Sequence, residues 1–169
     1  MQRWPERVMR VLGIDPGSRR TGWGVVQLEG TRLLHVGAGT IAVPEKLALE
    51  KRLQLIHAGL EQVIAEHSPD AVAVEEIFFA KYANAALKLG HARGIALLVA
   101  AQSDLEVHEY PPAIVKRTVV GRGAADKVQV TRLITALLGL KAAPEEDAAD
   151  ALAVAITHIQ ASRSKAIAR

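Results

Sequence analysis

A short apolar run at residues 71–74 (AVAV) stands between two long segments of helical character, and it limits the folds open to the chain. Before it, from about Lys46 to His67, apolar residues recur at intervals of three and four, which places them on one helix face. After it, an Ala- and Leu-rich helix is expected to be capped by Asn84 and to run to about Ser103. An apolar run without polar alternation predicts a strand buried on both faces, as in a parallel sheet covered by helices.

The rest of the chain supplies further strands and helices. Apolar runs bounded by turn residues predict four more strands, at residues 11–14, 23–28, 33–41 and 106–110. Two further helices are expected at residues 128–138 and 145–162, the second introduced by Pro144. This order predicts a mixed α/β fold with a five-stranded sheet, in which a three-stranded antiparallel meander adjoins parallel strands reached through helical crossovers.

Length and composition limit the organisation and the chemistry. We expect one domain over residues 1–169, with loosely ordered ends at residues 1–9 and 162–169, because the chain contains no repeat and no long linker. The absence of cysteine removes disulfides and thiolate nucleophiles, and it leaves carboxylates and histidines as the strong metal ligands. No segment has the length of a signal sequence or of a membrane span, which predicts a cytoplasmic protein.

Acidic residues stand where buried structure is expected. Asp15 ends the first strand, and Glu75 and Glu76 end the fourth. Asp147 and Asp150 are three residues apart, so they share one face of the last helix, where small apolar residues follow them. Asp150 lies beyond the first helical turn, so its burial costs free energy unless a cation meets it. Because neighbours on a strand point to opposite faces, only one of Glu75 and Glu76 can join such a group, and periodicity does not choose between them.

Carboxylates gathered in one place repel each other and call for a cation. Mg²⁺ is the hard ion that binds carboxylates while leaving positions open for phosphate and water. Two such ions about 4 Å apart activate water and stabilise the leaving oxygen in phosphodiester hydrolysis, without a nucleophilic side chain. The alternative is that these acids have structural roles only. In that case Asp15 forms a turn before Pro16, and the acids at the start of the last helix, Glu145 and Glu146 above all, interact with its positive N-terminal end.

A basic segment and an aromatic group indicate a polyanionic partner. Residues 111–141 contain a single acid, Asp126, against six basic residues, which are Lys116, Arg117, Arg122, Lys127, Arg132 and Lys141. The flanking Gly121 and Gly123 make the loop at Arg122 flexible enough for its backbone to approach phosphate, although a solvated polar face is the alternative. Three aromatic residues, Phe78, Phe79 and Tyr82, lie next to Lys81; we expect one phenylalanine in the core and the other, with Tyr82, to stack on unpaired bases.

Four blocks of the chain, taken together, carry a resemblance. They are GIDPGSRRTGWGVV (13–26), VEEIFFAKYANAALKLGHARG (74–94), VKRTVVGRGAADKVQV (115–130) and DAADALAVAITH (147–158). In this order they resemble RuvC, the family of bacterial Holliday-junction resolvases, from about residue 11 to residue 158. The resemblance implies a ribonuclease H-like fold and a homodimer that makes paired, symmetric nicks in four-way DNA junctions during recombination and repair.

The resemblance also implies roles for particular residues. By position, the catalytic acids and metal ligands are Asp15, Glu75, Asp147 and Asp150, which selects Glu75 over Glu76 by similarity; some relatives have histidine in place of Asp147. The implied DNA contacts are Phe78, Lys81, Tyr82, Lys116, Arg117, Arg122 and Lys127, with Phe78 as a wedge at the crossover. Tyr82 departs from the family, in which this position is commonly polar. The implied cofactor is Mg²⁺, two ions per active site, with Mn²⁺ as a substitute, and the implied protein partners are RuvA and RuvB.

Three other interpretations stay open. A YqgF-like nuclease acting on RNA has a similar opening strand and turn, but lacks the blocks at Phe78 and at residues 124–127. A sugar-kinase or actin-like ATPase needs two similar lobes, whereas 169 residues accommodate one. The third is a non-catalytic module that only binds junctions. The substitution Asp15→Asn distinguishes it from a nuclease, because a nuclease with this substitution loses cutting and keeps junction binding.

Overall fold

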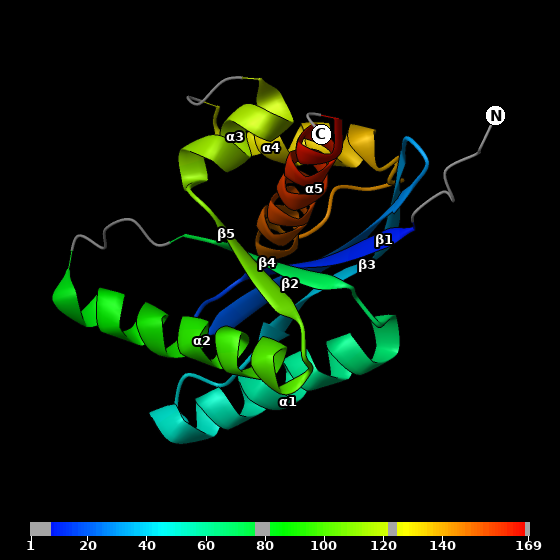
Figure 1. The fold of residues 1–169 in the computed structure, drawn as a ribbon. Helices are drawn as coiled ribbons and strands as arrows, with labels where there is room; N and C mark the ends of the chain where they lie inside the picture. Colours follow the sequence, from blue (N-terminus) through cyan, green and yellow to red (C-terminus); the bar gives the residue numbers. More distant parts are fainter. Residues whose placement is uncertain (1–7, 77–81, 122–124, 168–169) are drawn as a thin grey trace.

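The computed structural model describes residues 8–76, 82–121 and 125–167, and it contains one mixed sheet of five strands in the order β3-β2-β1-β4-β5 (Figure 1). The strands are β1 (Met9–Asp15), β2 (Arg20–Glu29), β3 (Arg32–Ala42), β4 (Ala71–Glu75) and β5 (Glu106–Tyr110). Strands β1, β2 and β3 form an antiparallel meander, while β4 is parallel to both β1 and β5. The predicted mixed sheet is therefore confirmed.

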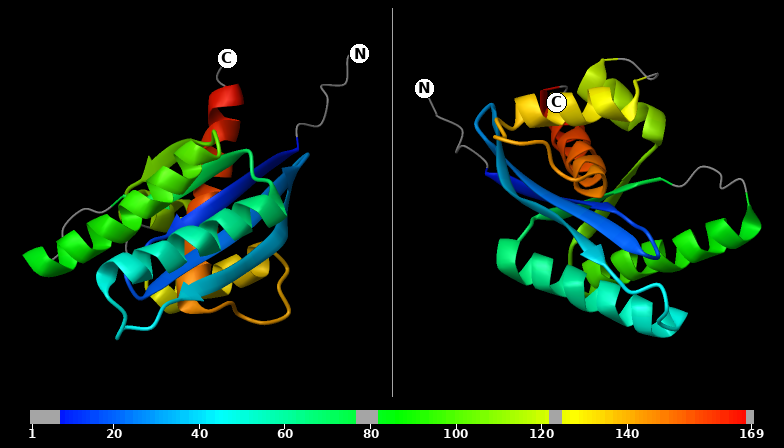
Figure 2. Two further views of the ribbon diagram at one scale, coloured as in Figure 1. Left: turned by 90° about the horizontal axis from the view of Figure 1, so that it is seen from below. Right: turned by 180° about the vertical axis from the view of Figure 1, so that it is seen from behind.

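Helices cover both faces of this sheet. Helices α1 (Leu49–His67) and α2 (Ala83–Gln102) lie on one face, and the other face carries α3 (Pro112–Val120), α4 (Lys127–Leu137) and α5 (Glu146–Ile167) (Figures 1 and 2). Among the described residues, no helix is both long and apolar enough to cross a membrane.

The central strands are buried on both faces, as the run at residues 71–74 predicts. In β4, Val72 and Val74 pack with α1 and α2, whereas Ala73 packs with α5 on the opposite face. In β1, Leu12 and Ile14 likewise face one core and Val11 faces the other. Each fully buried aliphatic side chain contributes roughly 1.5–3 kcal/mol, so the two cores hold the helices firmly against the sheet.

Helix α3 is a difference from the sequence-based expectation, in which residues 112–120 form no helix. Pro111 is its N-cap and Pro112 lies in its first turn, where proline is tolerated because the first backbone N–H groups have no partner within the helix. Its buried side chains are Val115 and Val119, one turn apart. Two buried positions in a segment of nine residues are too few to define a helical period.

Two predicted boundaries are also corrected. The N-cap of α2 is Tyr82, with extended backbone and no side-chain capping bond, and Asn84 lies within the first turn. Helix α5 continues to Ile167, so residues 162–167 are helical where loose order was expected, and Met9 already belongs to β1. The extension of β1 follows from packing, because Met9 packs against the core and pairs with Leu28 of β2.

Candidate active site

The ends of β1 and β4 place two carboxylates at one edge of the sheet. The strands run parallel, and their register pairs Val11 with Ala71 and continues to Ile14 with Val74. Asp15 and Glu75 are the next residues, and each is the last residue of its strand. The carboxyl ends of parallel strands are the usual location of sites in α/β sheets, because the side chains there are anchored by the sheet while facing solvent.

Glycines in β1 and β2 bring helix α5 to this edge. A Cβ atom on Gly13 would lie 1.9 Å from the carbonyl oxygen of Ala151, and one on Gly22 would lie 2.0 Å from the carbonyl oxygen of Asp147. Gly22 is the residue opposite Asp15 in the β1–β2 ladder. The backbone of α5 therefore rests directly on the strands, and its first turns, which carry Asp147, lie beside Asp15.

The electrostatic coupling shows that four acids share one environment. The pKa of Asp15 is raised from 3.8 to about 7, first by burial and then by the negative charges of Asp150, Glu75 and Asp147. Burial is also the largest cause of the raised pKa of Glu75, followed by the charge of Asp150. Burial again comes first for the raised pKa of Asp150. We call Asp15, Glu75, Asp147 and Asp150 the carboxylate cluster.

The electrostatic environment separates Glu75 from Glu76. Glu75 is coupled to both Asp15 and Asp150 through their charges. Glu76 follows the strand, and its backbone N–H donates a hydrogen bond to the carbonyl oxygen of Tyr110 in β5. Among the described interactions of the carboxylate cluster, the partner from this end of β4 is therefore Glu75, which is the residue that the resemblance selects.

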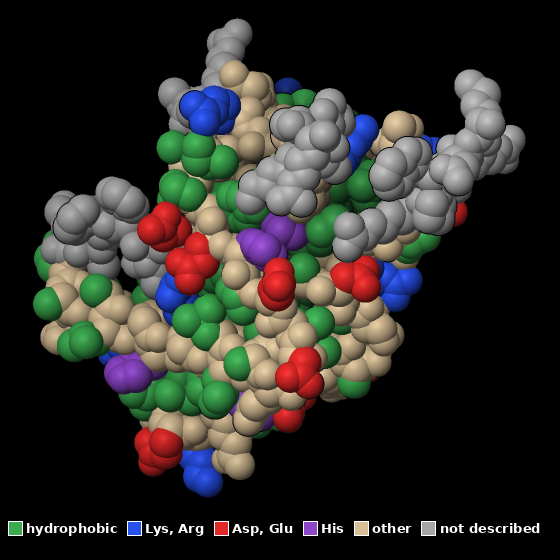
Figure 3. Space-filling model, in the orientation of Figure 1, with side chains coloured by type: hydrophobic (Ala, Val, Ile, Leu, Met, Phe, Trp, Pro, Cys, Tyr) green, Lys and Arg blue, Asp and Glu red, His purple; other side chains and the backbone are tan. Residues whose placement is uncertain are grey.

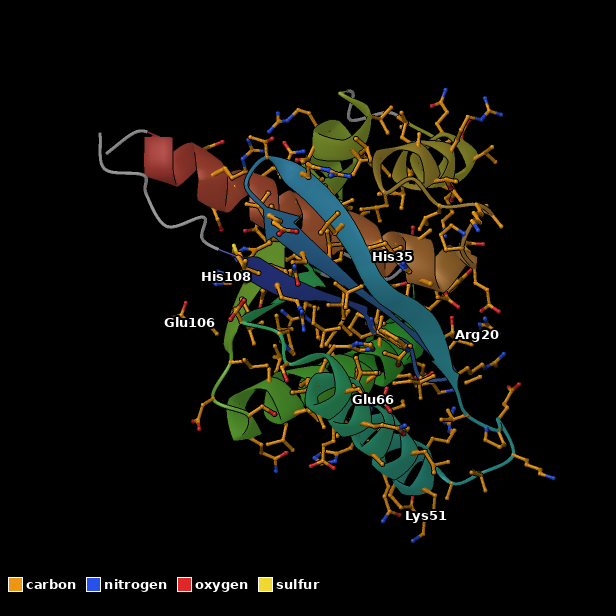
Figure 4. All side chains as sticks on the ribbon, turned by 90° about the vertical axis from the view of Figure 1, so that its right-hand side faces the viewer. Arg20, His35, Lys51, Glu66, Glu106 and His108 are labelled. Carbon is orange, nitrogen blue, oxygen red and sulfur yellow. The ribbon has the colours of Figure 1, made fainter. Side chains whose placement is uncertain are left out.

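Two cations meet the acids of α5. Lys127 Nζ lies 3.6 Å from Asp150 Oδ2 and also pairs with Glu146. This confirms the expectation that Asp150 needs a cationic neighbour. Arg20 Nε donates a 2.7 Å hydrogen bond to Asp147 Oδ2, and its Nη2 atom donates one of 2.8 Å to Glu145 Oε2. Arg20 projects from the strand edge near the start of α5 (Figure 4).

Lys127 is held in place by the start of its own helix. The N-cap of α4 is Asp126, whose carboxylate accepts a 2.8 Å hydrogen bond from the backbone N–H of Gln129. The Gln129 side chain in turn accepts a bond from the Asp126 backbone N–H, which completes a capping box. Because Lys127 is the first residue of this capped helix, the cap fixes its local backbone conformation, and the packing of α4 against α5 sets its position relative to Asp150.

The other residues with predicted DNA contacts are dispersed. Lys116 in α3 carries a charge that lowers the pKa of Glu75, which places it near the carboxylate cluster. Arg117 is exposed on the same helix, and none of its described contacts reaches the cluster. Tyr82 begins α2 with 68% of its surface exposed. Phe78, Lys81 and Arg122 lie outside the described residues.

The face that carries β5 is rich in exposed acidic side chains (Figure 3). Figure 3 shows Asp and Glu side chains spread over the middle of this face, with Lys and Arg side chains toward its margins. Glu106 and Glu109 of β5 are both exposed. Acidic residues on an edge strand discourage pairing with other chains, and they also make this face unfavourable for a polyanion. The cations that meet the carboxylate cluster come instead from the start of β2 and from α4.

Arg20 contacts the acids of α5, and the sequence alone does not predict this contact. Its partner Asp147 is 127 residues away, so only tertiary packing brings the two together. Glu146 likewise becomes a partner of Lys127 through packing of α4 against α5. No local spacing carries a signal for either pair.

The carboxylate cluster fits a hard divalent cation by its chemistry. All its donors are carboxylate oxygens, and mutual repulsion with burial raises the pKa of three of its members. In the described part of the chain, no three Asp, Glu, His or Cys side chains already form a ligand set for one ion. Two of the acids are turned to Arg20 and Lys127 instead. These cations offset part of the negative charge that a divalent ion would neutralise.

The comparisons with known proteins point to one family. The family described as "Crossover junction endodeoxyribonuclease RuvC" matches residues 11–158. A protein with that name from Sorangium cellulosum is 56% identical over 154 residues, covering 91% of this chain and 86% of the relative. Its namesake from Rhodopseudomonas palustris is 52% identical over 163 residues, covering 94% of each chain. The structure of T. thermophilus RuvC in complex with Holliday junction substrate superposes with a TM-score of 0.88 at 36% identity, covering 93% of this chain and 96% of that one.

Proposed function

Because the chain belongs to the RuvC family of crossover junction endodeoxyribonucleases, we propose that the carboxylate cluster is the active site with which it hydrolyses the DNA backbone. The protein is a structure-selective endonuclease that resolves four-way (Holliday) junctions in recombination and repair. Its five-stranded mixed sheet with helices on both faces is the ribonuclease H-like fold of that family. The assignment of the site is carried by one observation: the start of α5, with Asp147, packs directly on Gly22, the residue opposite Asp15 in the β1–β2 ladder.

We propose Mg²⁺ as the cofactor, two ions per active site, with Mn²⁺ as a substitute. The ligands are Asp15, Glu75, Asp147 and Asp150. When bound, the divalent ions stabilise negative charge on the phosphate and lower the pKa of the attacking water. Ca²⁺ should support junction binding but poor cutting, because its looser coordination misplaces the water.

The chain's own residues orient the phosphate and balance its charge. Lys127, whose Nζ atom lies beside Asp150, supplies positive charge where charge develops on the phosphate oxygens. Lys116, whose charge acts on Glu75, contributes to the same region from α3. Burial of the acids limits the water around them, which strengthens each of these interactions. In this proposal Arg117, Tyr82 and, outside the described residues, Phe78, Lys81 and Arg122 hold the DNA.

Symmetric cutting requires two active sites. Two nicks related by a twofold axis follow from an isologous dimer, so we propose that the chain acts as a homodimer. Sedimentation at the concentration used for cutting tests this, because a monomer that still makes paired nicks would contradict it. The partnership with RuvA and RuvB stays a prediction of the family resemblance.

The test of the active site uses synthetic four-way, duplex and single-stranded DNA with Mg²⁺. We expect paired nicks confined to the four-way junction for the unmodified protein, and binding without cutting for Asp15→Asn. Asp104→Asn is the matched control, because Asp104 is exposed with a φ of 55°, a conformation that asparagine also tolerates. Cutting that survives Asp15→Asn would overturn the assignment, and binding without cutting by the unmodified protein would favour a non-catalytic module.

A further inference from the structure

A second feature, separate from the carboxylate cluster, is a cavity of about 640 Å³ between the β1–β2 turn and the first turns of α1 and α2. Its lining includes Ser18 and Arg19 from the turn, Arg52 from α1, and Tyr82 and Lys88 from α2. We call it the Arg52 cavity. It shares no lining residue with the carboxylate cluster, but Ser18 follows Asp15 by only three positions, so the two sites lie at the two ends of one short turn.

Arg52 is the unusual member of this lining. It lies on the buried face of α1 with Ile56 and Leu60, and only 8% of its surface is exposed. Its Nη1 atom donates a 3.2 Å hydrogen bond to the carbonyl oxygen of Ser18, but its buried Nε atom has no acceptor among the described residues. No described carboxylate lies within ion-pair distance of it. Burying a charge without a counter-ion is costly, so the site favours an incoming anion.

The remaining charges around the cavity are also positive on balance. Three cations, Arg19, Arg52 and Lys88, face one acid, Glu45, and Glu45 is paired with Arg19. Lys88 is exposed and forms no described ion pair. The N-terminal ends of α1 and α2 both border the cavity, and the backbone N–H groups of helix N-termini add partial positive charge. An anion entering the cavity would therefore meet both side-chain and backbone positive charge.

Tyr82 indicates what else the anion carries. Its ring lines the cavity while 68% of its surface stays exposed, which suits a flat ligand stacking on its outer side. Guanidinium groups match phosphate oxygens, and aromatic rings accept nucleobases of any sequence. A nucleic-acid strand carries both groups, because its phosphates and its bases follow one another along the chain.

We propose that the Arg52 cavity binds a backbone phosphate of the DNA substrate, with Arg52 and Lys88 facing the phosphate and Tyr82 stacking on an adjacent base. This inference rests on the proposed function, because it takes the DNA that is cut as the ligand. Its position beside the turn after Asp15 makes it a second grip on a strand that passes the carboxylate cluster. Such a grip sets where the strand lies relative to the acids.

The test measures the affinity for a synthetic four-way junction in Ca²⁺ at a series of salt concentrations. Each phosphate contact contributes roughly 0.9 to the slope of log affinity against log salt. Lys88→Gln is expected to lower the slope by about that amount. Lys51→Gln is the matched control, because it removes the same charge from an exposed position on α1 that does not line the cavity (Figure 4). Equal slopes for the two variants would overturn the proposal.

Two further variants separate the phosphate contact from base stacking. Tyr82→Ala is expected to weaken junction binding roughly tenfold with little change in salt slope, and Tyr82→Phe is expected to restore it. Arg52→Lys keeps the charge and loses the planar group; its folding is followed by circular dichroism. Lys88 and Tyr82 are exposed, so their variants keep the test decisive even if Arg52 variants unfold.

The source of the phosphate is decided by a competition arm with inorganic phosphate. If the cavity binds free phosphate rather than DNA, millimolar phosphate will raise the melting temperature of the unmodified protein and not of Lys88→Gln, while the salt slope for DNA stays the same in both; that result overturns the proposal. If the unmodified protein neither binds nor cuts junctions, the proposed function itself is wrong. If the unmodified protein cuts normally and Lys88→Gln leaves the salt dependence of junction binding unchanged, only the proposal for the Arg52 cavity is wrong.

Discussion

Arg20 Nε donates a 2.7 Å hydrogen bond to Asp147 Oδ2, and this bond joins the start of β2 to the first turn of α5 across 127 positions of the sequence. The pair is partly exposed, with 52% of the arginine and 28% of the aspartate side chain accessible. Exposed ion pairs contribute about 0–1 kcal/mol, so its main effect is on the position and charge of Asp147 and not on folding. The arginine occupies a carboxylate oxygen that a divalent ion would need.

Arg20→Gln should therefore strengthen divalent-ion binding while changing stability little. Removing one positive charge near the carboxylate cluster is expected to lower the Mn²⁺ dissociation constant roughly threefold to tenfold, because repulsion of the ion is reduced. Calorimetric titration with Mn²⁺ measures this directly, and Arg32→Gln at the start of β3 controls for the change in net charge. A weaker Mn²⁺ affinity in Arg20→Gln would mean that the arginine positions Asp147 for the ion.

The raised pKa of Asp15 predicts how stability depends on pH without metal. Between about pH 4 and pH 7 the folded protein holds a proton on Asp15 that the unfolded chain has released, so stability falls as pH rises through this range. The loss is at most about 4 kcal/mol, and it is complete above pH 7. Asp15→Asn removes the titrating group, and its stability should vary less over the same range. Urea unfolding in EDTA at pH 4 to 8 measures both profiles; parallel profiles would contradict the prediction.

Gly22 should be intolerant of any side chain. A Cβ atom there would lie 2.0 Å from the carbonyl oxygen of Asp147, so Gly22→Ala must push α5 away from β2. We expect destabilisation of about 1–3 kcal/mol or more, with at least a tenfold loss of cutting because Asp147 is displaced. Gly90→Ala is the control: no neighbouring atom lies within 4 Å of a Cβ atom there, and alanine in a helix is favoured by about 0.5–1 kcal/mol. Chemical unfolding and junction cutting are measured on both variants.

Glu75 and Glu76 make an adjacent pair for testing the site. Glu75→Gln should abolish cutting and leave junction binding close to normal, since it removes a carboxylate coupled to Asp15 and Asp150. Glu76→Gln should keep most of the cutting activity, because its described contact is made by the backbone. Single-turnover cutting and binding in Ca²⁺ are compared for the two variants. If Glu76→Gln abolished cutting and Glu75→Gln did not, the active-site glutamate would be Glu76 and the assignment of Glu75 would be wrong.

Local sequence was sufficient for most of the fold. Strand β4 is predicted because its apolar run has no polar alternation, and the acids at the ends of β1 and β4 are visible from their positions after such runs. The long amphipathic helix α1 is visible from its period. Helix α3 escapes prediction because it is only nine residues long and its buried side chains are Val115 and Val119 alone. A short helix of this kind depends on packing against α5 more than on its own pattern.

What the sequence alone determined was the set of elements and the residue types at their ends, because periodicity and turn chemistry act over a few neighbouring residues. The tertiary structure decided which charges meet: Arg20 with Asp147, Lys127 with Asp150, and Glu75 with Asp15. It also decided that Arg52 is buried beside an open cavity and without a described counter-ion. These contacts arise where helices settle on a sheet, at distances set by glycines and by side-chain packing, and no local pattern records them.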